Sequence, residues 1–352
     1  MRALARLLPR TRGPVPDWSA RPYRILYLRY DRIGDMILAT PLIRAIATSH
    51  PTLTVDVLAS PVNAPVLEGN PHVRRVHRFD ARRKAGYWRA LRTLRRERYD
   101  AVVDDHAAVR KASLTMIFVM LATGARHRIG VAGQENEFIY TIPVAPAPRG
   151  HQLEMAAVIA RVFGVEPDLE RWRPEIALTN DEKARADEAW RGVEARAAVA
   201  TPRRLLVNAS AAIAKRQWPR ERYIAVVRDV ARRHPDLAIG VIGAPREWEV
   251  VRAIAEAVGA SALETPGVRD AFALVAGADA IFTPDTSITH AAVAFRVPVA
   301  VFILTSSAAY VPWRVPHRLV WVHERTFADL PAEPVIEAVD DLLRNAAPRR
   351  RR

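Results

Sequence analysis

The sequence predicts an α/β protein of two Rossmann-like, doubly wound domains that face each other across a cleft. Short apolar runs of strand type alternate with helical segments along most of the chain, the pattern of a parallel sheet covered by helices. A charged, alanine-rich helix over residues 180–198 and the breaker Thr201-Pro202 interrupt this alternation, which then restarts. At 352 residues, the chain is also longer than one hydrophobic core usually supports.

The segment 24–41, RILYLRYDRIGDMILATP, has the pattern that opens a βαβ unit. Residues 25–28 are an apolar run of strand type, residues 30–34 form a polar turn with a glycine, and helical spacing begins at Asp35. Ligands of open α/β sheets bind at the carboxyl ends of the strands, so we expect Asp35 at the mouth of the cleft. Its carboxylate would cap the helix or accept a proton from a substrate, and geometry alone favours the cap.

The rest of the first half continues the alternation. Strands are expected at 54–58, 73–79, 101–104 and 127–131, and helices at 64–68, 87–98, 112–123 and 151–163. We assign residues 1–22 to a flexible basic lead, 23–180 to the N-terminal domain and 181–203 to a linker helix.

The second half repeats the strand–helix alternation. Strands are expected at 205–208, 238–242, 280–283 and 297–303, and helices at 220–234, 247–258, 286–295 and 333–344. We assign residues 204–330 to the C-terminal domain and 331–346 to a helix that packs back toward the N-terminal domain. Residues 347–352 form an arginine tail.

The composition is that of an ordinary globular protein, with 50% hydrophobic and 26% charged residues. The chain has no cysteine, which excludes disulfides and zinc–sulfur sites and fits a reducing compartment. The longest apolar run, 112–125, is too short to span a membrane and is expected to be a buried helix. The arginines scattered through the first residues argue against a cleaved signal peptide.

The formal net charge of +15 requires an explanation. A basic excess is typical of proteins that meet nucleic acid, anionic membranes or phosphorylated substrates, and here it concentrates at 78–98 and 349–352. A solvated arginine-rich surface is the alternative. The chain has no zinc-finger spacing and no aromatic-basic RNA motif, so nucleic-acid binding is a minor hypothesis.

The segment 284–290, PDTSITH, follows a buried strand and opens a helix. The backbone N–H groups of such a helix start, with the hydroxyls of Thr286 and Ser287, would bind a phosphate. A plain N-cap at Asp285 or Thr286 explains the same residues equally well. His290, one turn into the helix, is more typical of a packed histidine than of a ligand.

Two further loops of the second half carry charge at the carboxyl end of a strand. Lys215 and Arg216 are adjacent cations that would neutralise a diphosphate, or would simply be solvated. Glu247 would bind ribose hydroxyls, or would be an ordinary residue of a helical first turn.

Several common motifs are absent from the sequence. There is no Walker loop, no G-x-G-x-x-G, no G-x-S-x-G and no histidine–carboxylate set with metal spacing. A dehydrogenase, a P-loop ATPase and a serine hydrolase of the elbow type are therefore unsupported, and we expect no cofactor.

The order and spacing of several motifs resemble glycosyltransferase family 9, the ADP-heptose:lipopolysaccharide heptosyltransferases. The resemblance covers about residues 22–315. The matching segments are Arg32-Ile33-Gly34-Asp35 with Pro41, the strand 99–104 (YDAVVD), 127–130 (HRIG), 151–154 (HQLE), 215–219 (KRQWP), 284–290 and 297–299 (VPV). The sequence departs from the family pattern at Ser287, where the family has glycine, and in 302–307 (FILTSS), which lacks the family's glycine; the family's equivalent segments border the donor.

The resemblance implies a GT-B fold and an inverting transfer without a metal ion, with Asp35 as the catalytic base. By resemblance, the C-terminal domain binds the nucleotide diphosphate sugar through Lys215, Arg216, Glu247, Asp285, Thr286, Ser287 and His290. The N-terminal domain binds the acceptor, and we assign Arg32, Gly34, Arg110 and Lys111 to that role, although a solvated helix start explains the last two as well.

The acceptor implied by the resemblance is lipopolysaccharide core or another lipid-linked surface glycan, reached from the cytoplasmic side. The enzyme would then be cytoplasmic, or peripheral on the inner leaflet of the inner membrane. Two alternatives remain open: a family relative that binds nucleotide sugar or glycan with little catalysis, and a basic nucleic-acid-binding protein, whose mark would be a steep salt dependence of binding.

Overall fold

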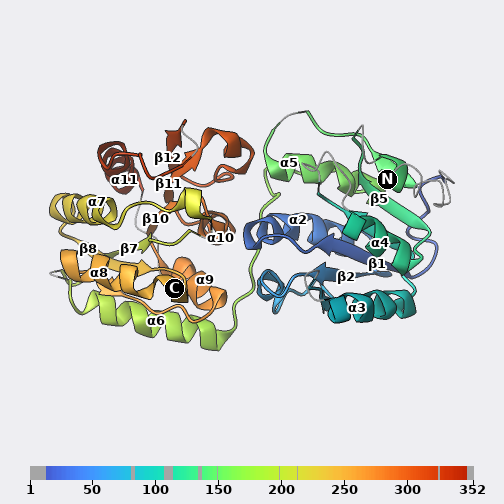
Figure 1. The fold of residues 1–352 in the computed structure, drawn as a ribbon, viewed down its shortest axis with the longest axis horizontal. Helices are drawn as coiled ribbons and strands as arrows, with labels where there is room; N and C mark the ends of the chain where they lie inside the picture. Colours follow the sequence, from blue (N-terminus) through green and yellow to red (C-terminus); the bar gives the residue numbers. More distant parts are fainter. Residues whose placement is uncertain are drawn as a thin grey trace. The chain divides into compact units, whose positions relative to one another are not determined.

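A computed structural model gives the fold of the chain as two compact units, Met1–Arg173 and Pro174–Arg352. The residues described are 13–80, 84–106, 114–133, 137–148, 150–197, 199–211, 213–323 and 326–346. Each unit contains a six-stranded parallel sheet with helices packed on it (Figure 1). The predicted class, α/β with two doubly wound domains, is confirmed.

The sheet of unit 1 has the strand order β3-β2-β1-β4-β5-β6, and every strand pair is parallel. Its strands are β1 Tyr23–Arg29, β2 Leu53–Ala59, β3 Arg75–Arg78, β4 Ala101–Asp104, β5 His127–Val131 and β6 Ile142–Val144. Both central strands are almost wholly buried, so their apolar runs show no alternation. The short edge strand β6 was not predicted.

Helices cover both faces of this sheet. They are α2 Ile33–Ser49, α3 Lys84–Glu97, α4 Leu114–Thr123 and α5 Gln152–Ala157, with 3₁₀ turns η1 Ala64–Leu67, η2 Glu137–Ile139 and η3 Val158–Phe163. α3 and α4 pack together over Leu26, Leu28 and Val102 of the sheet. α2 packs with α5 and η3. The β1 side chains that alternate with Leu26 and Leu28 point to the face of the sheet opposite α3 and α4.

Residues 17–22 do not belong to a flexible lead, as the sequence had suggested. The indole of Trp18 is buried, stacks on Phe163 and donates a 2.7 Å hydrogen bond from Nε1 to the carbonyl oxygen of Val162. An aromatic ring anchored this way ties the segment before β1 to η3. Residues 1–12 and 347–352 lie outside the described residues.

The sheet of unit 2 has the order β12-β11-β10-β7-β8-β9, again with every pair parallel. Its strands are β7 Arg203–Asn208, β8 Leu237–Ile242, β9 Ser261–Ala262, β10 Ala280–Pro284, β11 Val299–Leu304 and β12 His317–Val322. The edge strands β9 and β12 were not predicted. In both units the first strand of the unit lies inside the sheet, the arrangement of a doubly wound fold.

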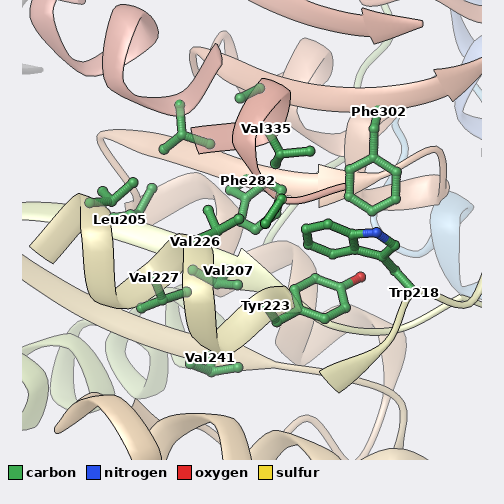
Figure 2. Close-up of a cluster of buried hydrophobic side chains, with 14 of the residues drawn as sticks. Leu205, Val207, Trp218, Tyr223, Val226, Val227, Val241, Phe282, Phe302 and Val335 are labelled. Carbon is green, nitrogen blue, oxygen red and sulfur yellow. The ribbon is translucent and has the colours of Figure 1, made fainter. Parts of the chain in front are cut away.

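The helices of unit 2 form two groups. The α-helices are α6 Asn180–Glu194, α7 Arg220–Arg233, α8 Trp248–Val258, α9 Val268–Gly277, α10 Ser287–Phe295 and α11 Glu333–Asn345; the 3₁₀ turns are η4 Ala214–Arg216, η5 Pro245–Glu247 and η6 Thr305–Tyr310. α7 contacts α8 and α11, whereas α9 contacts α6 and α10. The first group covers an aromatic core in which Trp218, Tyr223, Phe282 and Phe302 lie against one another (Figure 2).

The linker assignment is corrected by this packing, and the packing of α11 within unit 2 is also defined. The helix expected as a linker, α6, belongs to unit 2: Trp190 is fully buried, and its Nε1 donates to the carbonyl oxygen of Leu274 in α9 at 3.1 Å. The helix expected to pack back toward the N-terminal domain, α11, uses its apolar stripe within unit 2. Val335, Val339 and Leu342 are buried there because α11 lies against α7, β11 and β12.

None of the described helices is long and apolar enough to cross a membrane.

Candidate functional site

The strand order of unit 1 reverses between β1 and β4, which makes their carboxyl ends the switch point where ligands of such sheets bind. Leu28 pairs with Asp104 at this point. The next residues are Arg29 on β1 and Asp105 after β4. Two neighbouring strands therefore deliver opposite charges to one place.

Arg29 lies at the centre of a buried ionic network. Its side chain is 3% exposed, and its guanidinium forms an ion pair with the buried carboxylate of Asp105. Nε lies 3.2 Å from Oδ1 of Asp31, and Nη2 lies 3.3 Å from Oδ1 of Asp35. The hydroxyl of the fully buried Tyr27 also donates to Asp105. One arginine thus holds three carboxylates from the turn, from α2 and from the end of β4.

The charges of this network shift its protonation. Burial alone would lower the pKa of Arg29, but the facing carboxylates raise it well above its ordinary value. The pKa of Asp31 is raised from its ordinary value because burial, and the like charge of Asp35, outweigh the attraction of Arg29. Asp31 therefore takes up a proton at a higher pH than an ordinary exposed aspartate does.

A second pair extends the network beyond β4. Asp104 accepts a hydrogen bond from the hydroxyl of Tyr140 at 2.7 Å and pairs with Nδ1 of His106, whose Nε2 lies 3.7 Å from Oδ2 of Asp31. Burial would lower the pKa of His106, but the charge of Asp104 and the hydrogen bond to it together outweigh burial and raise the pKa. For Asp104, burial raises the pKa, but His106 outweighs this effect and lowers it.

His106 is expected to make the stability of unit 1 depend on pH. The pKa of an unfolded histidine is about 6.5, and a histidine with a higher pKa in the folded state stabilises the fold. This stabilisation is complete at pH values below the unfolded pKa. The contribution is lost as pH rises through the raised folded pKa. We expect the protection of the β4 amides against hydrogen exchange to fall as pH rises through this range. The fall should be larger than in the His106→Gln variant. Identical pH profiles for the two proteins would contradict the pairing.

Asp35 is the third residue of α2 and lies in the first turn of this helix, which follows β1. The N-cap position is Arg32, and no side chain forms a cap hydrogen bond there. The cap that geometry alone favoured for Asp35 is therefore not what the structure shows. The carboxylate is half-buried and faces Arg29, while Arg32 is exposed and Gly34 is buried. The interpretation of Asp35 as a proton acceptor keeps its structural basis, a carboxylate at the switch point.

The switch point of unit 2 lies between β7 and β10, and it is also marked by polar side chains. Asn208 ends β7, and its Nδ2 donates to Oγ1 of Thr283 at 2.9 Å and to Oγ1 of Thr286 at 3.2 Å. Thr286 is the N-cap of α10 and accepts from the backbone N–H of Ile288. The cap interpretation of Thr286 is thus confirmed, and its hydroxyl stands at the start of a helix, where anions bind.

Arg216 joins the loop after β7 to the end of β10. Its Nη1 donates to the carbonyl oxygen of Asp285 at 2.9 Å, its Nη2 lies 2.9 Å from Oδ2 of the same residue, and Nη2 also donates to Ser307 at 3.1 Å. A guanidinium has five N–H donors, more than these contacts use. Lys215 is exposed, and its carbonyl oxygen accepts from the backbone N–H of Phe327. The adjacent cations are therefore held differently, one locked in place and one in solvent.

Glu247 ends η5 and turns back on the loop. Its carboxylate accepts from the hydroxyl of Ser210 and, at 3.3 Å, from the backbone N–H of Ala244. The interpretation of Glu247 as a first-turn helix residue thus has a structural basis, and the carboxylate is still partly accessible. Gly243 lies beside it: a Cβ there would come within 2.7 Å of Cγ2 of Val251, so the close approach requires glycine.

The remaining predicted residues lie in or near these two switch points, or outside the described residues. Ser287 is the first residue of α10. His290 is buried in the same helix, with its ring centroid 6.3 Å from that of Tyr310, as expected for a packed histidine. Arg110 and Lys111 lie outside the described residues. Within the described parts of the chain, no group of three or more histidine or carboxylate side chains is arranged to hold a metal ion.

Comparison with known protein families identifies the chain. The model of glycosyltransferase family 9 (heptosyltransferase) matches residues 87–338. This match covers more than two thirds of the chain. The chain belongs to glycosyltransferase family 9. The resemblance seen in the motifs is therefore confirmed. A separate comparison with curated protein sequences found no match.

Solved structures of a family 9 glycosyltransferase and of two heptosyltransferases share the fold. A family 9 glycosyltransferase from Veillonella parvula DSM 2008 superposes with a TM-score of 0.77 at 17% identity, covering 92% of this chain and 97% of that one. The E. coli ADP-heptose lps heptosyltransferase II gives 0.68 at 19% identity, covering 92% and 100%. The E. coli heptosyltransferase WaaC with ADP-2-deoxy-2-fluoro heptose gives 0.68 at 17% identity, covering 90% and 99%. The GT-B class is confirmed by this likeness.

Sequence reasoning missed several polar residues that build the two switch points of this family 9 chain. They are Tyr27, Arg29, His106, Tyr140, Ser210 and Thr283. One signal was available: Arg29 is a charged residue that ends an otherwise buried strand, and a buried charge requires partners. The Asp104-Asp105-His106 triplet at the end of the buried strand β4 was a second signal.

Proposed function

We propose that this chain is an inverting, metal-independent glycosyltransferase that moves a heptose from ADP-heptose to the core of lipopolysaccharide or another surface glycan. The observation that carries the proposal is Asp35, a partly accessible carboxylate held by a buried arginine at the switch point of unit 1. Family membership and neighbours solved with ADP-heptose analogues or ADP support the sugar and the nucleotide.

The proposed reaction is a displacement at the anomeric carbon of the donor sugar. The oxygen of an acceptor hydroxyl attacks the anomeric carbon, the bond from that carbon to the diphosphate oxygen breaks, and the configuration inverts. The hydroxyl proton passes to the carboxylate of Asp35. The charge that develops on the leaving diphosphate is met by Arg216, by the exposed ammonium of Lys215 and by the helix start at Thr286. These groups supply the stabilisation that a metal ion would otherwise provide.

The other predicted residues take their proposed roles in the same scheme. Glu247 binds the ribose hydroxyls, while Asp285, Ser287 and His290 line the donor site. Arg32 and Gly34, with Arg110 and Lys111, bind the acceptor. Because a lipid-linked acceptor is membrane-anchored, we place the enzyme in the cytoplasm, peripheral on the inner leaflet of the inner membrane.

A transfer assay tests the proposal. The chain is incubated with ADP-heptose, or with competing UDP- and GDP-sugars, and with deep-core lipopolysaccharide acceptors, and the products are read by mass spectrometry. The expected result is a mass increase of one heptose with ADP-heptose. Donor binding without any transfer would overturn the proposal in favour of a weakly catalytic relative. The anomeric configuration of the product, determined by NMR, tests inversion.

Arg216 provides a separate prediction for the donor site. The Arg216→Lys variant keeps the charge but loses the fork that contacts Asp285 and Ser307 together, so the ammonium cannot hold the same position. We expect the Kd for ADP to rise about tenfold, as for the loss of one charged hydrogen bond, measured by calorimetry. Arg220→Lys, four residues further on and paired with Glu221 at the surface, is the control. Equal losses in both variants would contradict the assignment.

A further inference from the structure

The outer faces of α3 and α4 expose aromatic side chains. Trp88 on α3 is 59% exposed and Phe118 on α4 is 40% exposed. The two helices contact each other, and both bury their opposite faces in one core with Leu94 and Met120. Both aromatic side chains therefore stand on the same helical layer of unit 1, outside the residues that form the switch point.

α4 is apolar on its outer side as well as its inner side. Its sequence, LTMIFVMLAT, contains no charged residue. Met116, Ile117 and Met120 are buried, whereas Phe118 is exposed and Leu121 is half-buried, three residues further along the same stripe. A surface helix normally turns polar residues outward, and an apolar outer stripe indicates an interaction surface.

α3 carries a row of cations beside this stripe. Arg89, Arg92 and Arg96 are exposed, and the acidic residue of the helix, Glu97, forms ion pairs with Arg24, Arg74 and Arg75. Arg95, seven residues after Trp88 and therefore on its stripe, lies against Gly124 at the end of α4. Trp88 is thus on the flank of α3 that faces α4, between the arginines and the apolar stripe.

We propose that the outer faces of α3 and α4 are a docking surface for an anionic lipid bilayer. Aromatic and aliphatic side chains enter the headgroup and acyl boundary, where Trp is favoured, and the arginine guanidiniums contact lipid phosphates. The charge selects this occupant: exposed arginines of α3 beside the apolar stripe of α4 complement anionic headgroups above an acyl layer. The inference rests on the peripheral placement proposed above and adds the surface that makes the contact; binding to a bilayer itself requires neither donor nor acceptor.

Vesicle co-sedimentation of the full chain tests the proposal. We expect binding to phosphatidylglycerol–phosphatidylcholine vesicles and little binding to phosphatidylcholine alone. Two basic residues contribute about fivefold each, so Arg92→Gln/Arg96→Gln should weaken binding about 25-fold. Trp88→Ala should weaken it at least fivefold. The matched controls are Arg228→Gln/Arg232→Gln, which remove the same charge from α7 of unit 2, and Trp321→Ala, at a 40% exposed tryptophan of β12.

Each contrary outcome has its own meaning. Equal losses for the two arginine pairs would show that the net charge of +15 alone attracts the vesicles, and would overturn the proposal. A concentration-dependent dimer abolished by Trp88→Ala would make the surface a contact between copies. Urea midpoints equal to wild type confirm that the variants fold. Transfer to a lipid-free acceptor is measured in parallel, so that loss of the proposed activity and loss of docking are distinguished.

Discussion

The Asp35→Asn variant is expected to lose turnover by a factor of about 10² to 10⁴. The amide has nearly the shape of the carboxylate but cannot accept the hydroxyl proton, so the chemical step is affected while the fold is kept. Donor affinity, measured by calorimetry with ADP, should stay within about twofold because the proposed donor residues lie in unit 2. The measurement is kcat for transfer under saturating substrates.

The control for Asp35→Asn is Asp168→Asn, at an exposed aspartate of unit 1 that pairs with Arg171 in solvent. This variant should keep full turnover. If Asp35→Asn transfers sugar at the wild-type rate, another group must take the proton, and the assignment of Asp35 fails. If both variants lose activity together with stability, the effect is structural.

Replacing Arg29 with methionine is expected to destabilise unit 1 by about 3–5 kcal/mol, as for other buried ion pairs that lose one partner. Methionine fills similar volume, but Asp105 then keeps a buried charge without its ion-pair partner, and Asp31 and Asp35 lose the cation between them. The loss should shrink as pH falls toward about 4, because Asp31, whose pKa burial already raises, takes up a proton and its uncompensated charge is removed. Hydrogen exchange of the β1 and β4 amides reads this unit separately from unit 2.

Arg24 on the same strand is a matched control for Arg29. It pairs with Glu97, but it is partly exposed. Arg24→Met should therefore cost about 1 kcal/mol or less, as for a surface ion pair. Similar losses for the two variants would mean that the buried network contributes no more than a surface pair. A loss for Arg29→Met that does not change with pH would show that packing, not charge, is responsible.

The central strands of both sheets were predictable because they are buried on both faces. A strand such as β1 or β8 appears in the sequence as a continuous apolar run between turns, and the structure places it at the predicted position. The edge strand β12 was missed because it begins with the polar residues His317 and Arg318 and is mostly half-exposed. The edge strand β6 was missed because it has only three residues and contains Pro143, which is tolerated at an edge. The local sequence therefore shows which strands are buried more clearly than it shows which strands pair at an edge.

The domain limits show the same difference. α6 is charged and alanine-rich, which resembles a linker, yet Trp190 buries it in unit 2. Trp18 likewise fixes a segment that its basic neighbours had suggested was free. In each case a single large aromatic residue determined the packing, because burying one ring outweighs the polarity of several exposed neighbours.

By itself, the sequence determined the α/β class, the two domains, the family motifs and the position of Asp35 after the first strand. Only the tertiary structure decided which charges join its network, since Asp105 contacts Arg29 and His106 lies near Asp31, although both residues are far from them along the chain. Periodicity reports the face that each residue presents to a core, a local property. Ion pairs between neighbouring strands depend on strand order and register, and these are set when the whole sheet forms.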